Sequence, residues 1–134
     1  MQDRRIDSIV AAHAAQRPHR PAIAFQDTEL TYAGLEAEVA RMAGWLTAVG
    51  VGRGDRVALY ARNHPESFVT LLAASRIGAL MVPLNWRLSE AELAWQIADS
   101  APALILHGPE FAAMATGLAA AADCRCQEIG GSLD

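Results

Sequence analysis

The sequence contains no lysine, because all of its 11 basic side chains are arginines. Lysine is the residue that forms Schiff bases with carbonyl substrates and that reaches the phosphates in P-loop nucleotide sites. Both kinds of lysine-dependent chemistry are therefore excluded for this chain.

Cysteines are scarce, and the two that occur are Cys124 and Cys126. A structural zinc site uses four Cys or His ligands, and no histidine lies near this pair in the sequence. We therefore expect two free thiols and no metal site. Free thiols are usual in a reducing compartment, so we expect the protein to be cytoplasmic.

Long apolar runs are also missing, since no stretch approaches the ~18 apolar residues that a membrane-spanning helix needs. Residues 1–18 lack the apolar core of a signal peptide. The net charge is −4, which offers no attraction to nucleic acid or to an anionic membrane surface. We expect neither a membrane span nor a nucleic-acid partner.

The chain is long enough for one domain with a substantial core. It has 134 residues, of which 52% are hydrophobic, in the range of ordinary globular domains. Alanine and arginine are abundant, which we interpret as the mark of a GC-rich bacterial genome.

Residues 1–50 predict a helix, a hairpin and a second helix. Apolar residues at helical spacing begin at Ile6, and Pro18 ends that helix. Residues 22–26 and 29–31 are expected to pair as a hairpin around Gln26-Asp27-Thr28, and Thr31 to cap the next helix. That helix carries one apolar stripe, formed by Leu35, Val39, Met42, Ala43 and Leu46.

Residues 51–130 alternate between apolar strands and helices. Strands are expected from Arg56, Ala79, Ala103 and Cys126, and helices over about 64–77, 89–100 and 109–122. Such alternation is typical of a parallel sheet, and continuous apolar strands fit a sheet covered on both faces. The predicted fold class is therefore α/β: an open, mainly parallel sheet with helices on both faces, preceded by an N-terminal helix and a short hairpin.

The helix starts are marked by capping signals. Asn63 and Ser89 are each followed three residues later by glutamate, the spacing of a capping box. Gly108-Pro109 is expected to open the third helix of this part. After the last strand the chain ends in 130–134, although a parallel sheet needs a crossover and a further strand. We expect a cut at a loop, or a linker to more protein.

Two segments are similar to nucleotide-binding sites, but a local structural role explains each of them better. The spacing of glycines in 50–54 is similar to a dinucleotide fingerprint, but here a helix precedes and a strand follows. The opposite order is required, so we predict a tight turn after a helix. Residues 63–66 open a helix at the ligand-binding edge of the sheet, yet Glu66 would repel phosphate, which favours simple capping.

The strongest candidate site is Asn85-Trp86-Arg87, which follows a strand at the edge where open α/β sheets bind ligands. Arg87 offers a five-donor fork suited to phosphate, and Trp86 offers a surface for stacking. The alternative is a structural loop in which Asn85 holds the turn, Trp86 covers the core and Arg87 pairs with Glu90 or Glu92. The residues alone leave both interpretations open.

Over about residues 6–110, several ordered elements resemble the acyl-CoA synthetases of the AMP-forming, adenylate-making superfamily. Residues 75–93, SRIGALMVPLNWRLSEAEL, are similar to the family pattern x-x-x-G-A-x-x-V-P-L-N-x-R-L-x-x-x-E-L. Residues 50–57, GVGRGDRV, are similar to G-V-x-x-G-D-R-V. Residues 17–22 and 29–35 match two earlier elements, except that Gly34 stands where the family has an acidic residue.

The resemblance implies that 1–134 is an N-terminal subdomain of a ligase that joins a fatty-acyl type of carboxylic acid to CoA through an acyl-adenylate. It implies ATP, magnesium and CoA for the full-length enzyme. The family's phosphate loop ending in Pro-Lys-Gly and its catalytic lysine are absent, so we expect no catalytic residue, no cofactor and no activity in this chain alone. Arg87 matches an arginine that approaches the CoA phosphates in some family members, with Asn85 and Trp86 beside it.

Two other functions stay open on the sequence. The chain could be a stand-alone α/β module that binds a nucleotide or CoA with Arg87 and the helix start at Asn63. It could also be a structural piece that forms homo-oligomers, because an incomplete parallel sheet exposes an edge and an apolar face.

Overall fold

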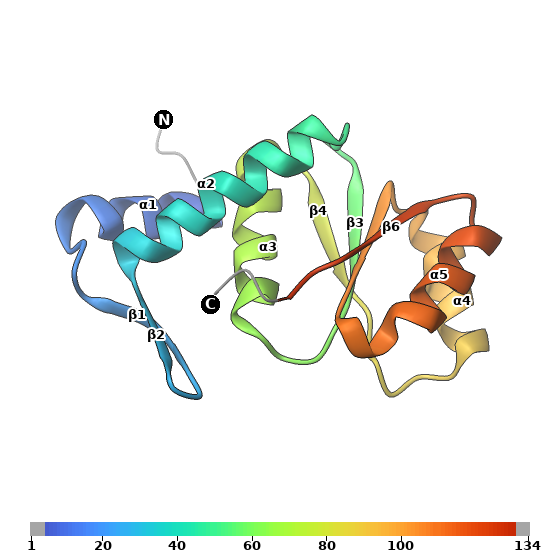
Figure 1. Ribbon diagram of the computed structural model, residues 1–134. Helices are drawn as coiled ribbons and strands as arrows, with labels where there is room; N and C mark the ends of the chain where they lie inside the picture. The colour runs from blue at the N-terminus through green and yellow to red at the C-terminus, as the bar shows by residue number, and fades with distance from the viewer. Residues whose placement is uncertain (1–4, 131–134) are drawn as a thin grey trace.

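The computed structural model describes residues 5–130. The helices and strands, in chain order, are α1 (Ile6–Gln16), β1 (Pro21–Phe25), β2 (Thr28–Thr31), α2 (Tyr32–Ala48), β3 (Arg56–Tyr60), α3 (Pro65–Ile77), β4 (Leu80–Pro83), α4 (Glu90–Ser100), β5 (Leu104–His107), α5 (Ala112–Ala121) and β6 (Arg125–Glu128). Figure 1 shows α1, α2 and α3 on one side of a four-stranded sheet and α4 and α5 on the other. Within residues 5–130, no helix combines the length and the apolar character needed to cross a membrane.

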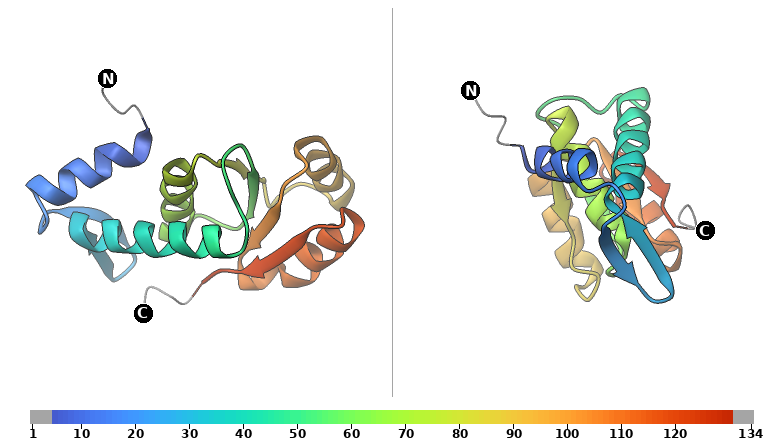
Figure 2. Two further views of the ribbon diagram at one scale, coloured as in Figure 1. Left: turned by 90° about the horizontal axis from the view of Figure 1, so that it is seen from above. Right: turned by 90° about the vertical axis from the view of Figure 1, so that its left-hand side faces the viewer.

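The N-terminal helix, hairpin and second helix are confirmed. Strands β1 and β2 pair antiparallel around a two-residue turn, and Gln26 in that turn adopts a φ of 51°. The side chain of Thr31 accepts a hydrogen bond from the N–H of Gly34 at 3.1 Å, which caps α2. Both figures place the hairpin at the end of the molecule farthest from α4 and α5 (Figures 1 and 2).

The predicted parallel sheet is confirmed, with the strand order β4-β3-β5-β6. Strand β3 therefore pairs on both sides, so that Ala58 lies opposite Val82 of β4 and Ile105 of β5. All three pairings in this sheet are parallel. Each connection between them carries a helix, as parallel neighbours require.

Helices cover both faces of the sheet because residues 57–60 of β3 are all apolar or aromatic and all buried. Val57 and Leu59 belong to a core shared with α1, α2 and α3. Ala58 and Tyr60, which point to the opposite face, belong to a second core shared with α4 and α5. The alternation of side chains along a strand thus divides one apolar run between two cores.

Strand β6 differs from the expected apolar strand. Arg125, Gln127 and Glu128 are exposed, and only Cys126 is partly buried, against the core of α4 and α5. The strand lies at the edge of the sheet, and α2 and α3 pack over its neighbours instead. Polar residues are the usual composition of an exposed edge.

Two predicted helix starts need correction. Helix α3 is capped by His64, not by Asn63: the ring Nδ1 of His64 accepts a hydrogen bond from the N–H of Glu66 at 3.2 Å. Because Pro65 has no N–H to satisfy, Glu66 carries the first N–H that needs a partner. The segment opened by Pro109 begins as a single 3-10 turn, and α5 starts three residues later.

Two other local predictions are confirmed. Ser89 forms a complete capping box with Glu92 at the start of α4. The glycine-rich segment 50–54 forms a turn between α2 and β3, in which Gly50 and Gly54 have φ values of 93° and 83°. The predicted loop or linker at 130–134 lies outside the described residues from 131 onward.

Gly78 ends α3 in the left-handed conformation, with a φ of 77°. Its C=O accepts a hydrogen bond from Gly54 at 2.8 Å, and an added Cβ would lie 3.1 Å from Cγ of Arg53. We predict that Gly78→Ala lowers the free energy of unfolding by about 1–2 kcal/mol, measured by urea denaturation, because a side chain disfavours this conformation.

The matched control is Gly44, which lies within α2 and where an added Cβ would meet no atom within 4 Å apart from its chain neighbours and the adjacent helix backbone. Gly44→Ala should raise stability by about 0.5–1 kcal/mol, because alanine has the higher helix propensity. A Gly78→Ala variant as stable as the wild type would contradict the structure.

The capping box at Ser89 fixes the end of the loop that carries the candidate site. We predict that Ser89→Ala lowers the free energy of unfolding by about 1 kcal/mol, because the N–H of Glu92 loses its partner. Ser67→Ala, in the first turn of α3, serves as the control and should change stability by less than about 0.5 kcal/mol.

The same box predicts an acid dependence. Hydrogen bonds from the backbone and side chain of Ser89 lower the pKa of Glu92 below its ordinary value of 4.5. Its contribution to stability is therefore present above pH 4.5 and is lost as the pH falls through the lowered pKa. Unfolding measured between neutral and acid pH should show a smaller loss in Glu92→Gln than in the wild type, and equal losses would contradict this assignment.

Candidate functional site

The carboxyl ends of the neighbouring strands β4, β3 and β5 lie side by side, at the carboxyl end of the sheet. Beyond the strand ends, the N–H of Leu84 donates to the C=O of Leu59 at 2.8 Å, and the N–H of Gly108 donates to the C=O of Tyr60 at 3.0 Å. The parallel register therefore continues to the last residues of β3. The loops that follow β3, β4 and β5 begin side by side as a result.

The loop after β4 is held by its own hydrogen bonds. The side-chain oxygen of Asn85 accepts from the N–H of Arg87 at 3.0 Å, and its C=O accepts from the N–H of Leu88 at 3.1 Å. Asn85 is thus the turn residue of the structural alternative. Trp86 is partly buried and packs against the core of α4 and α5, also as that alternative expects.

Residues of this loop and of the ends of β3 and β5 together form an arginine–aromatic cluster, made up of Tyr60, Arg62, Trp86, Arg87 and Phe111. The guanidinium carbons of Arg62 and Arg87 lie 4.5 Å and 5.0 Å from the centre of the Trp86 ring. The Phe111 ring lies 6.2 Å from Trp86 and stacks on Tyr60 at 4.4 Å. Tyr60 is the buried member of the cluster. Burial raises the pKa of its phenol, so the side chain is neutral at ordinary pH.

The pairing of Arg87 with Glu90 or Glu92, which the structural alternative included, is not formed. Ser89 engages the Glu92 carboxylate through its N–H at 2.8 Å and its hydroxyl at 2.9 Å. Among residues 5–130, no carboxylate lies within ion-pair distance of the Arg87 guanidinium. The side chain is exposed and rests on the Trp86 ring, which leaves its donors available to an anion.

The sequence analysis missed Arg62 and Phe111. Both lie just past a strand: Arg62 follows the last residue of β3 by two positions, and Phe111 follows β5 by four. The rule that placed Asn85-Trp86-Arg87 at the carboxyl edge applies to them equally. Arg62 also forms a long ion pair with Glu110, at 3.9 Å from its Nε.

The helix start at 63–66 is explained by capping, as predicted. Glu66 is only 4% exposed and lies in the first turn of α3, where its charge opposes phosphate binding. His107, at the end of β5, is equally buried, and its Nδ1 lies 2.9 Å from the C=O of Gly108.

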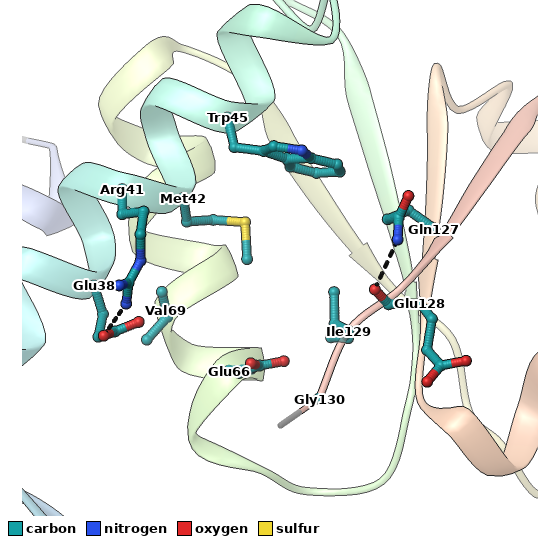
Figure 3. A pocket seen from close by; sticks show the side chains of 10 residues that line it. All are labelled: Glu38, Arg41, Met42, Trp45, Glu66, Val69, Gln127, Glu128, Ile129 and Gly130. Carbon is teal, nitrogen blue, oxygen red and sulfur yellow. Dashed lines mark hydrogen bonds and ion pairs between the residues drawn. The ribbon is translucent and has the colours of Figure 1, made fainter. Parts of the chain in front are cut away.

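A separate cavity of about 360 Å³ lies on the other side of the sheet, between α2, α3 and the C-terminal strand (Figure 3). Met42 and Trp45 project from α2 into this space, and Ile129 borders it beyond β6. Glu38 and Arg41 form an ion pair at its rim. Asn85, Trp86 and Arg87 do not line this cavity, whereas Glu66 of the 63–66 segment does.

Cys124 and Cys126 are free and partly buried. Burial raises the pKa of the Cys124 thiol, which makes it a poor nucleophile at neutral pH. In the part of the chain that the structure describes, no group of three or more His, Cys, Asp or Glu side chains is placed to hold a metal ion.

Comparison with known proteins shows the family to which the chain belongs. Residues 10–131 match the family model described as AMP-binding enzyme. A feruloyl-CoA synthase from Amycolatopsis sp is 42% identical over 120 residues, which are 90% of this chain and 24% of that protein. An indoleacetate–CoA ligase from Aromatoleum aromaticum is 42% identical over 101 residues, which are 75% of this chain and 20% of that protein.

Solved structures give the same result. A fatty acyl CoA synthetase from Mycobacterium tuberculosis is similar with a TM-score of 0.86 and 30% identity, over 93% of this chain and 26% of that one. The N-terminal domain of FACL13 from the same organism gives a TM-score of 0.87 and 28% identity, over 93% of this chain and 33% of that one. The resemblance seen in residues 75–93 is thereby confirmed: the chain belongs to the AMP-binding enzyme family and has the fold of an N-terminal portion of its acyl-CoA synthetases.

Proposed function

We propose that this chain is the N-terminal part of an ATP-dependent carboxylic acid–CoA ligase, which forms an acyl-adenylate and then an acyl-CoA thioester. The observation that carries this proposal is the family match over residues 10–131, combined with relatives that are named CoA synthases and ligases. The chain spans only about a quarter of the length of those relatives. ATP, magnesium and CoA are accordingly proposed as ligands of the whole enzyme.

Within the enzyme, the chain supplies a rigid layer and one edge of a binding surface. Adenylate formation depends on positioning the phosphates and on neutralising charge that develops during transfer. A chain without lysine has only arginines for that task. The described residues also offer no carboxylate set for magnesium, so we assign the metal and the chemical step to other parts of the enzyme.

The loop at Asn85-Trp86-Arg87 is the part of this chain that we assign to a ligand. Arg87 is exposed, and within residues 5–130 no carboxylate competes for its guanidinium. Asn85 fixes the turn that presents it, and the Trp86 ring supports its planar group. A guanidinium held in this way suits a phosphate group, and we propose a phosphate of CoA.

The acid substrate has two candidate classes. A fatty-acyl acid follows from the sequence pattern and fits the similarity to a fatty acyl CoA synthetase. An aromatic acid is the second candidate, because two relatives at 42% identity are named for feruloyl and indoleacetate substrates. Both classes share the same adenylation chemistry, so a direct comparison of acids decides between them.

Several further expectations stay predictions. We propose a bacterial protein located in the cytoplasm, which fits the composition and the two free thiols. Association into homo-oligomers would use the exposed edge strand β6 and the adjoining cavity beside Trp45. A stand-alone nucleotide- or CoA-binding module stays the alternative for the chain by itself.

We predict that the 134-residue chain catalyses no ATP–pyrophosphate exchange with any carboxylic acid, because it has no lysine to promote adenylation. The product of the full reading frame that contains it should catalyse this exchange. Both proteins should be assayed with long-chain fatty acids, ferulate and indoleacetate in parallel. The acid that gives the highest exchange identifies the substrate class.

The two possible failures have different meanings. Exchange by the 134-residue chain alone would refute its assignment as an inactive part. No exchange by the full-length product with any acid, in the presence of magnesium, would refute the ligase assignment itself.

A further inference from the structure

The guanidinium groups of two arginines, from the loops after two different strands, lie close to the same indole ring. Arg62 follows β3 and Arg87 follows β4, and their guanidinium carbons lie 4.5 Å and 5.0 Å from the centre of the Trp86 ring. The separation of the two carbons cannot exceed the sum of these distances. Two like charges thus lie beside one ring in a chain whose net charge is −4.

The described residues compensate these charges only in part. Glu110 lies 3.9 Å from Nε of Arg62, and the two side chains are 44% and 63% exposed. An ion pair this long and this open to solvent contributes little. Arg87 has no carboxylate partner among residues 5–130. The indole ring attracts both cations but does not neutralise their charge.

The support beneath the two arginines is firm. Trp86 packs on the core of α4 and α5, and its neighbour Phe111 stacks on Tyr60, which is 3% exposed. Arg62 and Glu110 also line an open cavity of about 430 Å³ at the same edge of the sheet. Of the two arginines, Arg62 borders this cavity, and Arg87 lies on the exposed surface beside Trp86.

We propose that Arg62 and Arg87 together form a two-arginine site for a ligand that carries a pair of phosphate groups. The inference rests on the proposed function, because it extends the assignment of Arg87 to a phosphate. Each guanidinium presents parallel N–H donors that match the oxygens of one phosphate group. Trp86 is the positioning residue that holds both guanidinium groups at the site.

Glu110 gives this proposal a distinctive consequence. Its carboxylate occupies the surroundings of Arg62 in the free protein, and a bound phosphate would compete with it for the same donors. Neutralising Glu110 removes both the competitor and the repulsion. Phosphate affinity should rise in Glu110→Gln, whereas a purely structural role of the pair would leave affinity unchanged.

The test is a titration of the 134-residue chain with inorganic pyrophosphate at low ionic strength, followed through the indole N–H resonance of Trp86. We expect Arg62→Gln and Arg87→Gln each to weaken binding by about tenfold. Glu110→Gln should strengthen it by about two- to threefold. The matched control is Arg53→Gln, an exposed arginine in the turn before β3, at the opposite edge of the sheet.

Parallel titrations with CoA and with ATP identify the source of the phosphates. The ligand whose affinity depends on both Arg62 and Arg87 is the one that occupies the site. If Arg62→Gln binds pyrophosphate as tightly as Arg53→Gln while Arg87→Gln does not, the two-arginine site is refuted and the assignment of Arg87 stands. Wild-type affinity in both single variants would refute the site altogether, with the exchange assay left as the separate test of the ligase.

Discussion

Burial of strand β3 on both faces is the constraint on which the rest of the structure depends. Val57 and Ala58 are adjacent, point to opposite faces and are both 0% exposed. Each therefore requires its own layer of helices, which α1–α3 and α4–α5 provide. The strand also needs a hydrogen-bonding neighbour on either side, and β4 and β5 fill these places in parallel.

The same register creates the candidate site. Parallel strands that pair with β3 must all end at one edge, so loops distant in sequence come together there. Trp86, which follows β4, thereby meets Arg62, which follows β3, and Phe111, which follows β5. The site is a consequence of strand pairing, and the loop after β4 alone would present a single arginine.

The positions of most strands and helices could be predicted from the sequence, because they depend on local patterns of residues. Apolar runs located the strands, and the spacing from Ser89 to Glu92 located the start of α4. Local patterns failed where a competing group was equally close: His64 caps α3 because Pro65 moves the first unsatisfied N–H to Glu66. They also failed for polar β6, whose place at the edge depends on strand order.

The cluster around Trp86 could not be predicted from local patterns, because it also depends on the order of the strands in the sheet. Nothing in the spacing of Arg62 or Phe111 shows that β3 lies between β4 and β5, and this order alone brings both residues to Trp86. The carboxyl-edge rule narrows the search to a few positions per loop. Contacts across the edge then have to be read from the structure.

Native-state amide hydrogen exchange of the 134-residue chain tests the central role of β3 most directly. If β3 is the strand on which both cores depend, its amides at 57–60 open only when the whole domain unfolds. They should then exchange most slowly, with the same free energy as global unfolding, whereas the exposed edge strand β6 exchanges faster through local opening. Exchange of β3 as fast as that of β6 would contradict this view of the fold.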